Sequence, residues 1–292
     1  MTLKIAFNTW VYSSFPVWVP SYPLTDTIER IAAIGYDGIE IGAASPHAYP
    51  DYLSRQRRHE IKTCLEANAL ALASMLPAPG GGPGFNAASP LPEERANTLD
   101  QYCKVVDLCA DLGGSTVIYV AGWQIFGTSR QQAWEWSRQA LEKIADHAAS
   151  RGVTIVIEPT SADSNLVDSC DDALQMKREV DRANVKLMFD TYHVIYRNEV
   201  SIDYIDRMGA DLHHVHLADA NRAGPSDAGK ADYRGVIQAL NRQNFRGYLT
   251  MEIGFDRRNV EPDRIAREAY CYIRALTVDA DAKAHAEQLV TL

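Results

Sequence analysis

The chain has little cysteine and no cysteine pattern. Its five cysteines, in 292 residues, are scattered, and none forms a Cys-x-x-Cys pair. This excludes a disulfide framework and a thiolate metal site, and it favours reduced thiols in a cytoplasmic protein. No run of about 18 apolar residues is present, so the sequence predicts no membrane span. The N-terminus lacks the basic and long apolar segments of a signal peptide and is instead typical of a first strand.

The chain also has a deficit of positive charge. It carries 29 Lys and Arg against 38 Asp and Glu, a formal net charge of -9. Proteins that bind nucleic acids neutralise phosphates with a basic surface, so this balance argues against a nucleic-acid partner. Apolar residues make up 46% and charged residues 23% of the chain, which is typical of a globular protein. We therefore expect a small molecule as the partner.

Two common glycine-rich phosphate-binding motifs are absent. The segment after the first apolar run, FNTWVYSS, lacks the dinucleotide-binding fingerprint, and no segment fits the phosphate-loop motif of nucleotide-binding enzymes. The one glycine-rich stretch is PAPGGGPGF at residues 77–85. Such a stretch is either a plain flexible connection or a mobile lid or phosphate cradle.

Short apolar runs alternate with segments of helical periodicity along the chain. The expected strands lie near residues 3–9, 35–42, 69–76, 115–122, 153–159, 184–190, 212–219 and 247–254. The expected helices lie near residues 24–35, 54–68, 92–112, 129–150, 170–180, 202–208, 233–241 and 262–276. Strands of this kind, flanked by helices, indicate a parallel sheet that is covered on both faces.

Eight such units predict a single-domain α/β fold, a (β/α)8 TIM barrel over residues 1–276. An open doubly wound sheet is the alternative, although it usually carries the glycine fingerprint that this chain lacks. Residues 277–292 form a polar, alanine-rich C-terminal tail. This tail is expected to be either an extra helix at a subunit contact or a loosely ordered end.

Four chemically reactive side chains lie where consecutive strands are expected to end. They are Glu158, Asp190, His216 and Glu252. In such a barrel the C-terminal strand ends form the active site, and charged groups are rarely buried there unless they are paired or bind metal. One imidazole and three carboxylates suit Mn²⁺, Mg²⁺ or Co²⁺ better than a thiolate-type zinc site. Any one of them taken alone could be a helix cap or an ion-pair partner.

Three histidines lie close together in the seventh expected strand. Side chains alternate between faces along a strand, so His214 and His216 share one face and His213 takes the other. His216 lies nearer the C-terminal end and is the better candidate ligand. We expect His214 to be a hydrogen-bonded core residue and His213 to face outward.

Further polar and aromatic side chains near the expected strand ends are candidates for substrate contacts. They are His193, Arg222, Glu40, His47, Trp123 and Asp163. Arg222 either clamps a substrate oxygen or is solvated, and Trp123 either stacks on a sugar or packs on the rim. Asp163 lies in a polar loop that could instead cap the next helix.

Five segments of the chain resemble a known superfamily. They are GYDGIEIG, IVIEPTSADSN, MFDTYH, HVHLADANR and YLTMEIG. Together they are similar to the xylose-isomerase-like sugar isomerases and epimerases, and most of all to ketose 3-epimerases of the D-tagatose and D-allulose type and to fructoselysine 3-epimerase. The likeness spans residues 3–276, and the stretch around His47 resembles the corresponding loop of the fructoselysine enzyme.

The resemblance implies roles for the candidate residues. Glu158, Asp190, His216 and Glu252 would bind a divalent metal, with Mn²⁺ favoured, and the two glutamates would also serve as the acid–base pair. His193 and Arg222 would hold the sugar. The relatives are often dimers or tetramers, which implies a homodimer or homotetramer.

One position departs from the family pattern. Those enzymes place a glutamate six residues after the first metal glutamate, where this chain has Ser164. Asp163 would take its place if the loop is one residue shorter. The departure concerns the hydroxyl pattern of the substrate more than the type of reaction.

The chemistry of such a site is proton abstraction next to a ketone, assisted by a metal acting as a Lewis acid. The leading hypothesis is a metal-dependent 3-epimerase of a ketose or keto-sugar derivative. A lyase or dehydratase acting on an inosose, a dehydroshikimate-like acid or a keto-glycoside is an alternative, as is an aldose–ketose isomerase. A nuclease resembling endonuclease IV shares the barrel, but it needs more histidines at the strand ends.

Overall fold

The computed structural model describes residues 3–13, 20–77, 84–254 and 261–290, and in this part of the chain eight parallel strands close into a barrel. The strands are β1 (Lys4–Asn8), β2 (Gly38–Ala43), β3 (Ala71–Pro77), β4 (Thr116–Val120), β5 (Thr154–Glu158), β6 (Val185–Asp190), β7 (Leu212–Leu217) and β8 (Tyr248–Met251). Each strand pairs in parallel with the next, and β8 pairs with β1. The expected TIM barrel is confirmed, and the open sheet is excluded.

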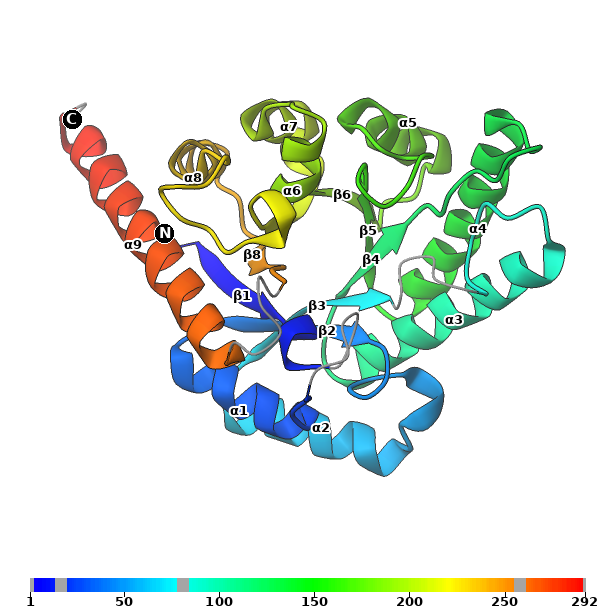
Figure 1. Ribbon diagram of the computed structural model, residues 1–292, viewed down its shortest axis with the longest axis horizontal. Coiled ribbons are helices and arrows are strands. Elements are labelled where there is room, and N and C mark those ends of the chain that lie inside the picture. Colours follow the sequence, from blue (N-terminus) through cyan, green and yellow to red (C-terminus); the bar gives the residue numbers. More distant parts are fainter. Residues whose placement is uncertain (1–2, 14–19, 78–83, 255–260, 291–292) are drawn as a thin grey trace.

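Helices surround the barrel as an outer ring (Figure 1). They are α1 (Leu24–Ile34), α2 (Arg55–Ala67), α3 (Pro92–Asp111), α4 (Arg130–Ser150), α5 (Cys170–Val180), α6 (Thr191–Tyr196), α7 (Ser201–Met208), α8 (Tyr233–Arg242) and α9 (Pro262–Val290). Short 3₁₀ turns add η1 (Thr9–Tyr12), η2 (Pro50–Tyr52), η3 (Gly209–Asp211) and η4 (Ala220–Arg222). Several helices begin at a serine whose hydroxyl accepts a backbone N–H, as Ser129 does from Gln132.

The core has two parts because both faces of the barrel wall are covered. The larger part lies between the strands and the helices, and a smaller cluster inside the barrel contains Leu76, Ile118, Val156 and Met188. Side chains two residues apart on a strand share a face. Glu158 and Asp190, two residues beyond Val156 and Met188, therefore point toward the barrel axis one layer closer to the C-terminal end.

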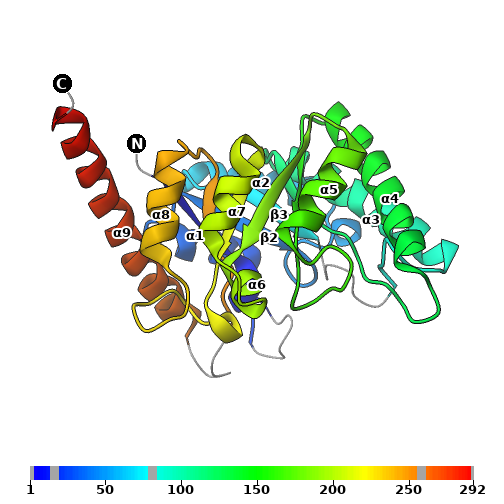
Figure 2. The ribbon, with the colours of Figure 1, turned by 90° about the horizontal axis from the view of Figure 1, so that it is seen from above.

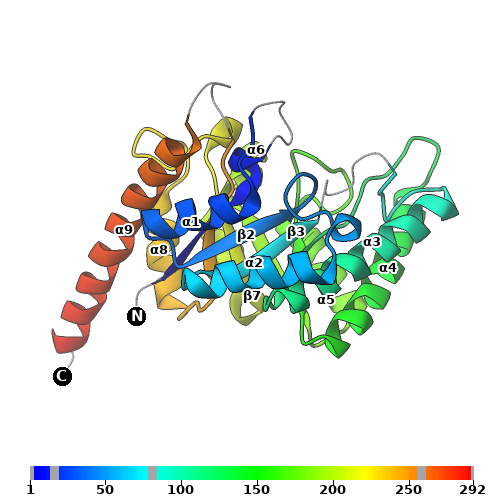
Figure 3. The ribbon, with the colours of Figure 1, turned by 90° about the horizontal axis from the view of Figure 1, so that it is seen from below.

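The last helix is longer than the sequence indicates. α9 continues past Leu276 to Val290, so the expected tail is helical, and its end projects past the N-terminal end of the barrel (Figures 1 and 3). Most of the glycine-rich stretch, residues 78–83, lies outside the described residues. Within the described part of the chain, no helix is long and apolar enough to cross a membrane.

The strand β7 contains an irregularity that changes the direction of one histidine. Leu187 pairs with Leu212 but Met188 pairs with His214, so His213 is an extra residue in β7. Its Nε2 lies 3.3 Å from the Thr116 hydroxyl of β4, a strand across the barrel. His213 therefore faces the barrel interior near its N-terminal end. The expectation that it faces outward was wrong because the alternation of faces holds only without a bulge.

Candidate active site

The four candidate metal ligands converge at one point. Glu158 and Asp190 are the last residues of β5 and β6, His216 lies in β7, and Glu252 follows β8 directly. Each offers one ligand atom, and these atoms lie within 4.8 Å of one another. All four side chains are buried, with at most 9% of a residue exposed. The loops that follow the strands, with α6 among them, gather at this end of the barrel (Figures 2 and 3).

The His216 ring lies between carboxylates. Its Nδ1 is 3.0 Å from Oε2 of Glu252 and 3.5 Å from Oε1 of Glu158. Its Nε2 is 2.9 Å from Oε2 of Glu40. Burial lowers the pKa of His216, but Glu40 and Glu252 outweigh burial and hold it well above the usual value. The Nδ1 edge thus faces the point where the other three candidate ligands meet.

The two glutamates have opposite electrostatic environments. Burial raises the pKa of Glu158 to about 7. Burial also raises the pKa of Glu252, but the Arg222 guanidinium and His216 outweigh it and bring that pKa to about 2. Two carboxylates in one site with pKa values displaced in opposite directions can serve as a proton donor and a proton acceptor.

The residues at this point fit a divalent metal ion. Oε1 of Glu158 is buried and has no hydrogen-bond partner among the described residues, which is costly for a carboxylate oxygen unless it binds a cation. Three buried carboxylates repel one another and need positive charge. Three oxygen donors and one imidazole are the set that Mn²⁺ or Mg²⁺ accepts.

Arg222 and His193 lie at the edge of this cluster. Nη1 of Arg222 is 2.6 Å from Oε2 of Glu252 and also contacts Asp190, and the guanidinium covers the Tyr192 ring at 4.2 Å. Nη2 of Arg222 lies 3.3 Å from Nε2 of His193. Arg222 has a φ of 59°, in the left-handed region that non-glycine residues rarely adopt. This backbone conformation is part of the loop geometry that directs the side chain into the cluster.

The His193 ring is a donor at the site. Its Nδ1 accepts the Ala162 N–H at 3.2 Å, so a neutral ring carries its proton on Nε2. Burial lowers the pKa of His193 to about 3, which keeps the ring neutral. Nε2–H and the guanidinium of Arg222 are then two donors side by side, an arrangement suited to binding one oxygen of a ligand.

Asp163, and not Ser164, faces these two donors. Oδ2 of Asp163 lies 3.7 Å from Nε2 of His193 and 3.8 Å from Nη2 of Arg222. The Asp163 side chain is 65% exposed, as expected at the mouth of a site. The Ser164 hydroxyl instead donates to the Gly122 carbonyl at 2.5 Å and so holds the loop to the segment after β4.

Glu40 lies below the rim and not at it. It is fully buried, and its oxygens contact His214 at 3.1 Å and Asn8 at 2.6 Å, as well as Ser74 and His216. These contacts occupy both oxygens and place Glu40 behind His216, and its expected contact with a substrate stays a prediction. His214 is a hydrogen-bonded core residue, as the sequence indicates.

His47 and Trp123 make no contact with the four candidate ligands among the described residues. His47 is buried, and its Nε2 lies 2.9 Å from the Tyr22 carbonyl oxygen. The main chain of Trp123 is held by Asn86, whose Oδ1 accepts its N–H at 3.1 Å. The structure therefore does not bring these two residues to the metal ligands.

Sequence reasoning did not identify three neighbours of the site. Asn8 and Ser74 both contact Glu40, and Tyr192 lies under the Arg222 guanidinium. Asn8 is the last residue of β1, so the rule that polar residues at strand ends face the site could have found it. Ser74 lies in the middle of β3, where nothing in the sequence sets it apart from core residues.

Comparison with known proteins identifies the family. Residues 28–276 match the family described as "Xylose isomerase-like TIM barrel". The chain belongs to this family. It is 25% identical over 261 residues to fructoselysine 3-epimerase of Shigella flexneri, covering 87% of this chain and 93% of that protein. It is 28% identical over 236 residues to D-psicose 3-epimerase of Ruminiclostridium cellulolyticum, covering 77% and 76%.

Solved structures agree on the fold. A structure of L-ribulose 3-epimerase superimposes with a TM-score of 0.82 at 20% identity, covering 99% of this chain and 98% of that one. The relatives are named epimerases, which are isomerases, so the expected resemblance and the expected enzyme class are confirmed. Metal dependence and the roles of individual residues stay predictions.

Proposed function

We propose that the protein is a divalent-metal-dependent epimerase that inverts C3 of a ketose or keto-sugar derivative through an enediolate. The observation that carries this proposal is the pair Glu158 and Glu252, two buried carboxylates with opposite pKa displacements, both within 3.5 Å of the His216 Nδ1. Proton removal and proton return need one acceptor and one donor, and the pair supplies both.

Glu158, Asp190, His216 and Glu252 would hold the metal, and Mn²⁺ is the ion we favour. When bound, the ion would act as a Lewis acid that stabilises the negative charge of the enediolate. Manganese, an assembly of two or four copies, and a cytoplasmic location also belong to this proposal.

The two glutamates would exchange roles between the two directions of the reaction. Glu252, ionised at neutral pH because of Arg222, would take the proton from C3. Glu158, whose raised pKa keeps a share of it protonated at neutral pH, would return a proton to the opposite face. For the reverse substrate, Glu158 in its ionised form would be the acceptor and Glu252 the donor, as reversibility requires.

Three side chains at the mouth would orient the sugar. The Nε2–H of His193 and the guanidinium of Arg222 would bind one substrate oxygen between them, and Asp163 would accept a hydroxyl hydrogen. Proton transfer requires the reacting carbon to be held close to both carboxylates, so these contacts position the substrate. Contacts of His47 and Trp123 with the substrate also belong to this proposal.

The test is a screen of ketoses, phosphorylated ketoses and keto-glycosides with the Mn²⁺-loaded protein in D₂O, followed by NMR. The expected result is a C3 epimer that carries deuterium at C3. Loss of water would instead indicate a dehydratase, and an aldose product would indicate an aldose–ketose isomerase; either outcome would overturn the epimerase proposal. If no sugar exchanges a proton with any divalent metal, the proposed reaction class is wrong.

A further inference from the structure

A cavity lies at the opposite end of the barrel from the candidate active site. It has a volume of about 590 Å³ and is lined by residues of β3, β4 and β7 and by the loop before β8. This is the end at which the strands begin and near which the N-terminus lies (Figure 3). Its volume is in the range of cavities that bind small metabolites.

His213 faces into this cavity because of the bulge in β7. Its Nε2 lies 3.3 Å from the Thr116 hydroxyl, and no other hydrogen-bond partner of the ring is present among the described residues. The ring is half-buried, and Nδ1 is left for a ligand. A bulge that interrupts a barrel strand often re-aims a side chain for a function.

The cavity is positively charged, in contrast to the protein as a whole. Lys4, His213, His214 and Arg246 are among its lining residues, and none of the described lining residues is an aspartate or a glutamate. The chain itself carries nine more acidic than basic residues. Lys4 is held at the mouth, because its Nζ lies 4.1 Å above the centre of the Tyr248 ring.

The titration of His213 reports the same positive field. Burial first, and then His214, Lys186 and Lys4, lower the pKa of His213 to about 4. Lys186 is paired with Asp211 at 2.7 Å. The part of this shift that Lys186 and Lys4 cause comes from positive charge, which favours an anion beside the ring.

The position of the loop before β8 depends on one glycine. A Cβ on Gly247 would lie 2.0 Å from the His213 carbonyl oxygen, so only glycine permits this close approach of the loop to β7. The approach places Arg246 and Tyr248, the neighbours of Gly247, beside the bulge that turns His213 inward. The loop and the bulge together build the cavity.

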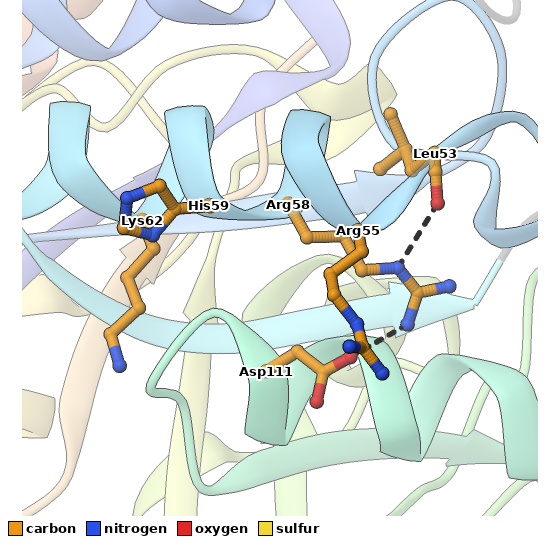
Figure 4. Close-up of a pocket in the computed structure, with 6 residues that line it drawn as sticks. All are labelled: Leu53, Arg55, Arg58, His59, Lys62 and Asp111. Atoms are coloured by element: carbon orange, nitrogen blue, oxygen red, sulfur yellow. Dashed lines mark hydrogen bonds and ion pairs between the residues drawn. The ribbon is translucent and has the colours of Figure 1, made fainter.

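A second basic pocket, on the outer surface, lacks these properties. It has a volume of about 510 Å³, and Arg55, Arg58, His59 and Lys62 of α2 line it (Figure 4). Asp111 also lines it and neutralises Arg58 at 2.8 Å. Arg55 and His59 are exposed to solvent. This pocket therefore serves as a comparison and not as a candidate site.

We propose that the cavity at the N-terminal end of the barrel binds the phosphate group of a small phosphorylated metabolite, with His213 and Lys4 as its main contacts. A phosphate monoester offers the negative charge and the acceptor oxygens that these donors require. Free phosphate would fill only part of a cavity of about 590 Å³, so the monoester is the better fit. The site is independent of the proposed epimerase activity.

The test uses the full chain with labelled histidine, both metal-free and loaded with Mn²⁺. NMR follows the ring signals of His213 during titration with glycerol 3-phosphate, inorganic phosphate, and glycerol, at constant ionic strength in chloride. We expect a saturable shift with glycerol 3-phosphate, weaker binding of inorganic phosphate and no shift with glycerol. The signal is assigned with His213→Gln, which should weaken binding by at least about tenfold, the size of one lost charge-assisted hydrogen bond.

Three further variants separate the sites. Lys4→Gln, which removes a surface charge, should weaken binding about fivefold or more, and it provides a test by calorimetry if His213→Gln does not fold. His59→Gln, in the outer pocket, should bind as the wild type does. Arg222→Gln, at the other end of the barrel, should also leave the His213 shift unchanged.

Four outcomes would overturn the proposal. The first is a His213 shift that does not saturate or that chloride reproduces, and the second is binding of inorganic phosphate that is as tight as that of the monoester or tighter. The third is unchanged binding of glycerol 3-phosphate in Lys4→Gln, and the fourth is loss of the His213 shift in Arg222→Gln.

Discussion

Oε2 of Glu40 lies 2.9 Å from Nε2 of His216, and both residues are fully buried. A carboxylate at this place favours a proton on Nε2 and leaves the lone pair of Nδ1 directed toward the candidate metal point. Carboxylates behind a metal-binding histidine orient the ring and raise its basicity. Glu40, from β2, thus connects the barrel interior to the rim through His216.

Replacement of Glu40 should weaken metal binding without removing a ligand. We expect Glu40→Ala to raise the Kd for Mn²⁺ by about 10–100-fold, the usual cost of losing such a partner. Calorimetric titration of the metal-free protein measures this directly, with the exposed Glu268→Ala as the control. An unchanged Kd in a folded Glu40→Ala protein would show that the His216 ring is held by other contacts.

Removal of the metal should lower the thermal stability. An ion bound only by the folded state stabilises it by about 2.7 kcal/mol at a free concentration of 100 Kd. Thermal unfolding with and without Mn²⁺ should therefore show a higher Tm with the ion. The increase should disappear in Asp190→Asn and persist in Asp100→Asn, whose side chain is 61% exposed. If no divalent metal changes the Tm of the wild-type protein, that result would argue against the metal site.

The two glutamates should be distinguishable by isotope exchange. Glu158→Gln and Glu252→Gln should both stop epimerisation, because an amide cannot accept a proton. Each variant should still exchange the C3 proton with D₂O from the face whose base remains, without inversion. His193→Ala should mainly raise KM, since it removes a positioning contact. A Gln variant that still inverts C3 at saturating metal would refute the two-base mechanism and leave the metal site intact.

Asp163 and Ser164 should have different effects when they are replaced. Asp163→Ala removes a carboxylate near His193 and Arg222, so we expect a higher KM with little change in Tm. Ser164→Ala removes the hydrogen bond to the Gly122 carbonyl, so we expect a loss of about 1 kcal/mol in the free energy of unfolding. Kinetics with the substrate found in the screen, together with denaturant unfolding, measure both. The reverse pattern would assign the substrate contact to Ser164.

Asp219 should make stability depend on pH. Its carboxylate accepts the Ala220, Lys230 and Ala231 N–H groups at 2.7–3.2 Å. Burial raises its pKa, but these hydrogen bonds outweigh burial, so the pKa in the folded state lies below the usual value. Its contribution is therefore complete above the unfolded-state pKa of about 3.9 and is lost as the pH falls through the folded-state pKa.

Asp219→Asn isolates this contribution from the other acids. We expect a loss of about 2–3 kcal/mol at pH 7, the scale of hydrogen bonds to a charged group. The difference between wild type and variant, from urea unfolding at each pH, should shrink below about pH 4. A difference that stays constant down to pH 2 would mean that the charge of Asp219 does not matter.

The sequence by itself determined the barrel fold and which four side chains lie at the C-terminal ends of its strands. Parallel strands all end at the same edge, so Glu158, Asp190, His216 and Glu252, each at or near the end of an apolar run, had to meet once the sheet closed. That inference needs only the order of the elements and the position of each residue along its strand.

Only the tertiary structure decided which side chains lie behind the rim and which lie at its mouth. The sequence places Glu40 near the end of the second strand, but β2 runs on to Ala43, so Glu40 lies mid-strand and, with the stagger of strands around the barrel, one layer lower, against His214 and His216. The bulge in β7 turned His213 inward, against the alternation that its position implies. Strand stagger and bulges arise from the pairing of strands far apart in the sequence, so no local pattern encodes them.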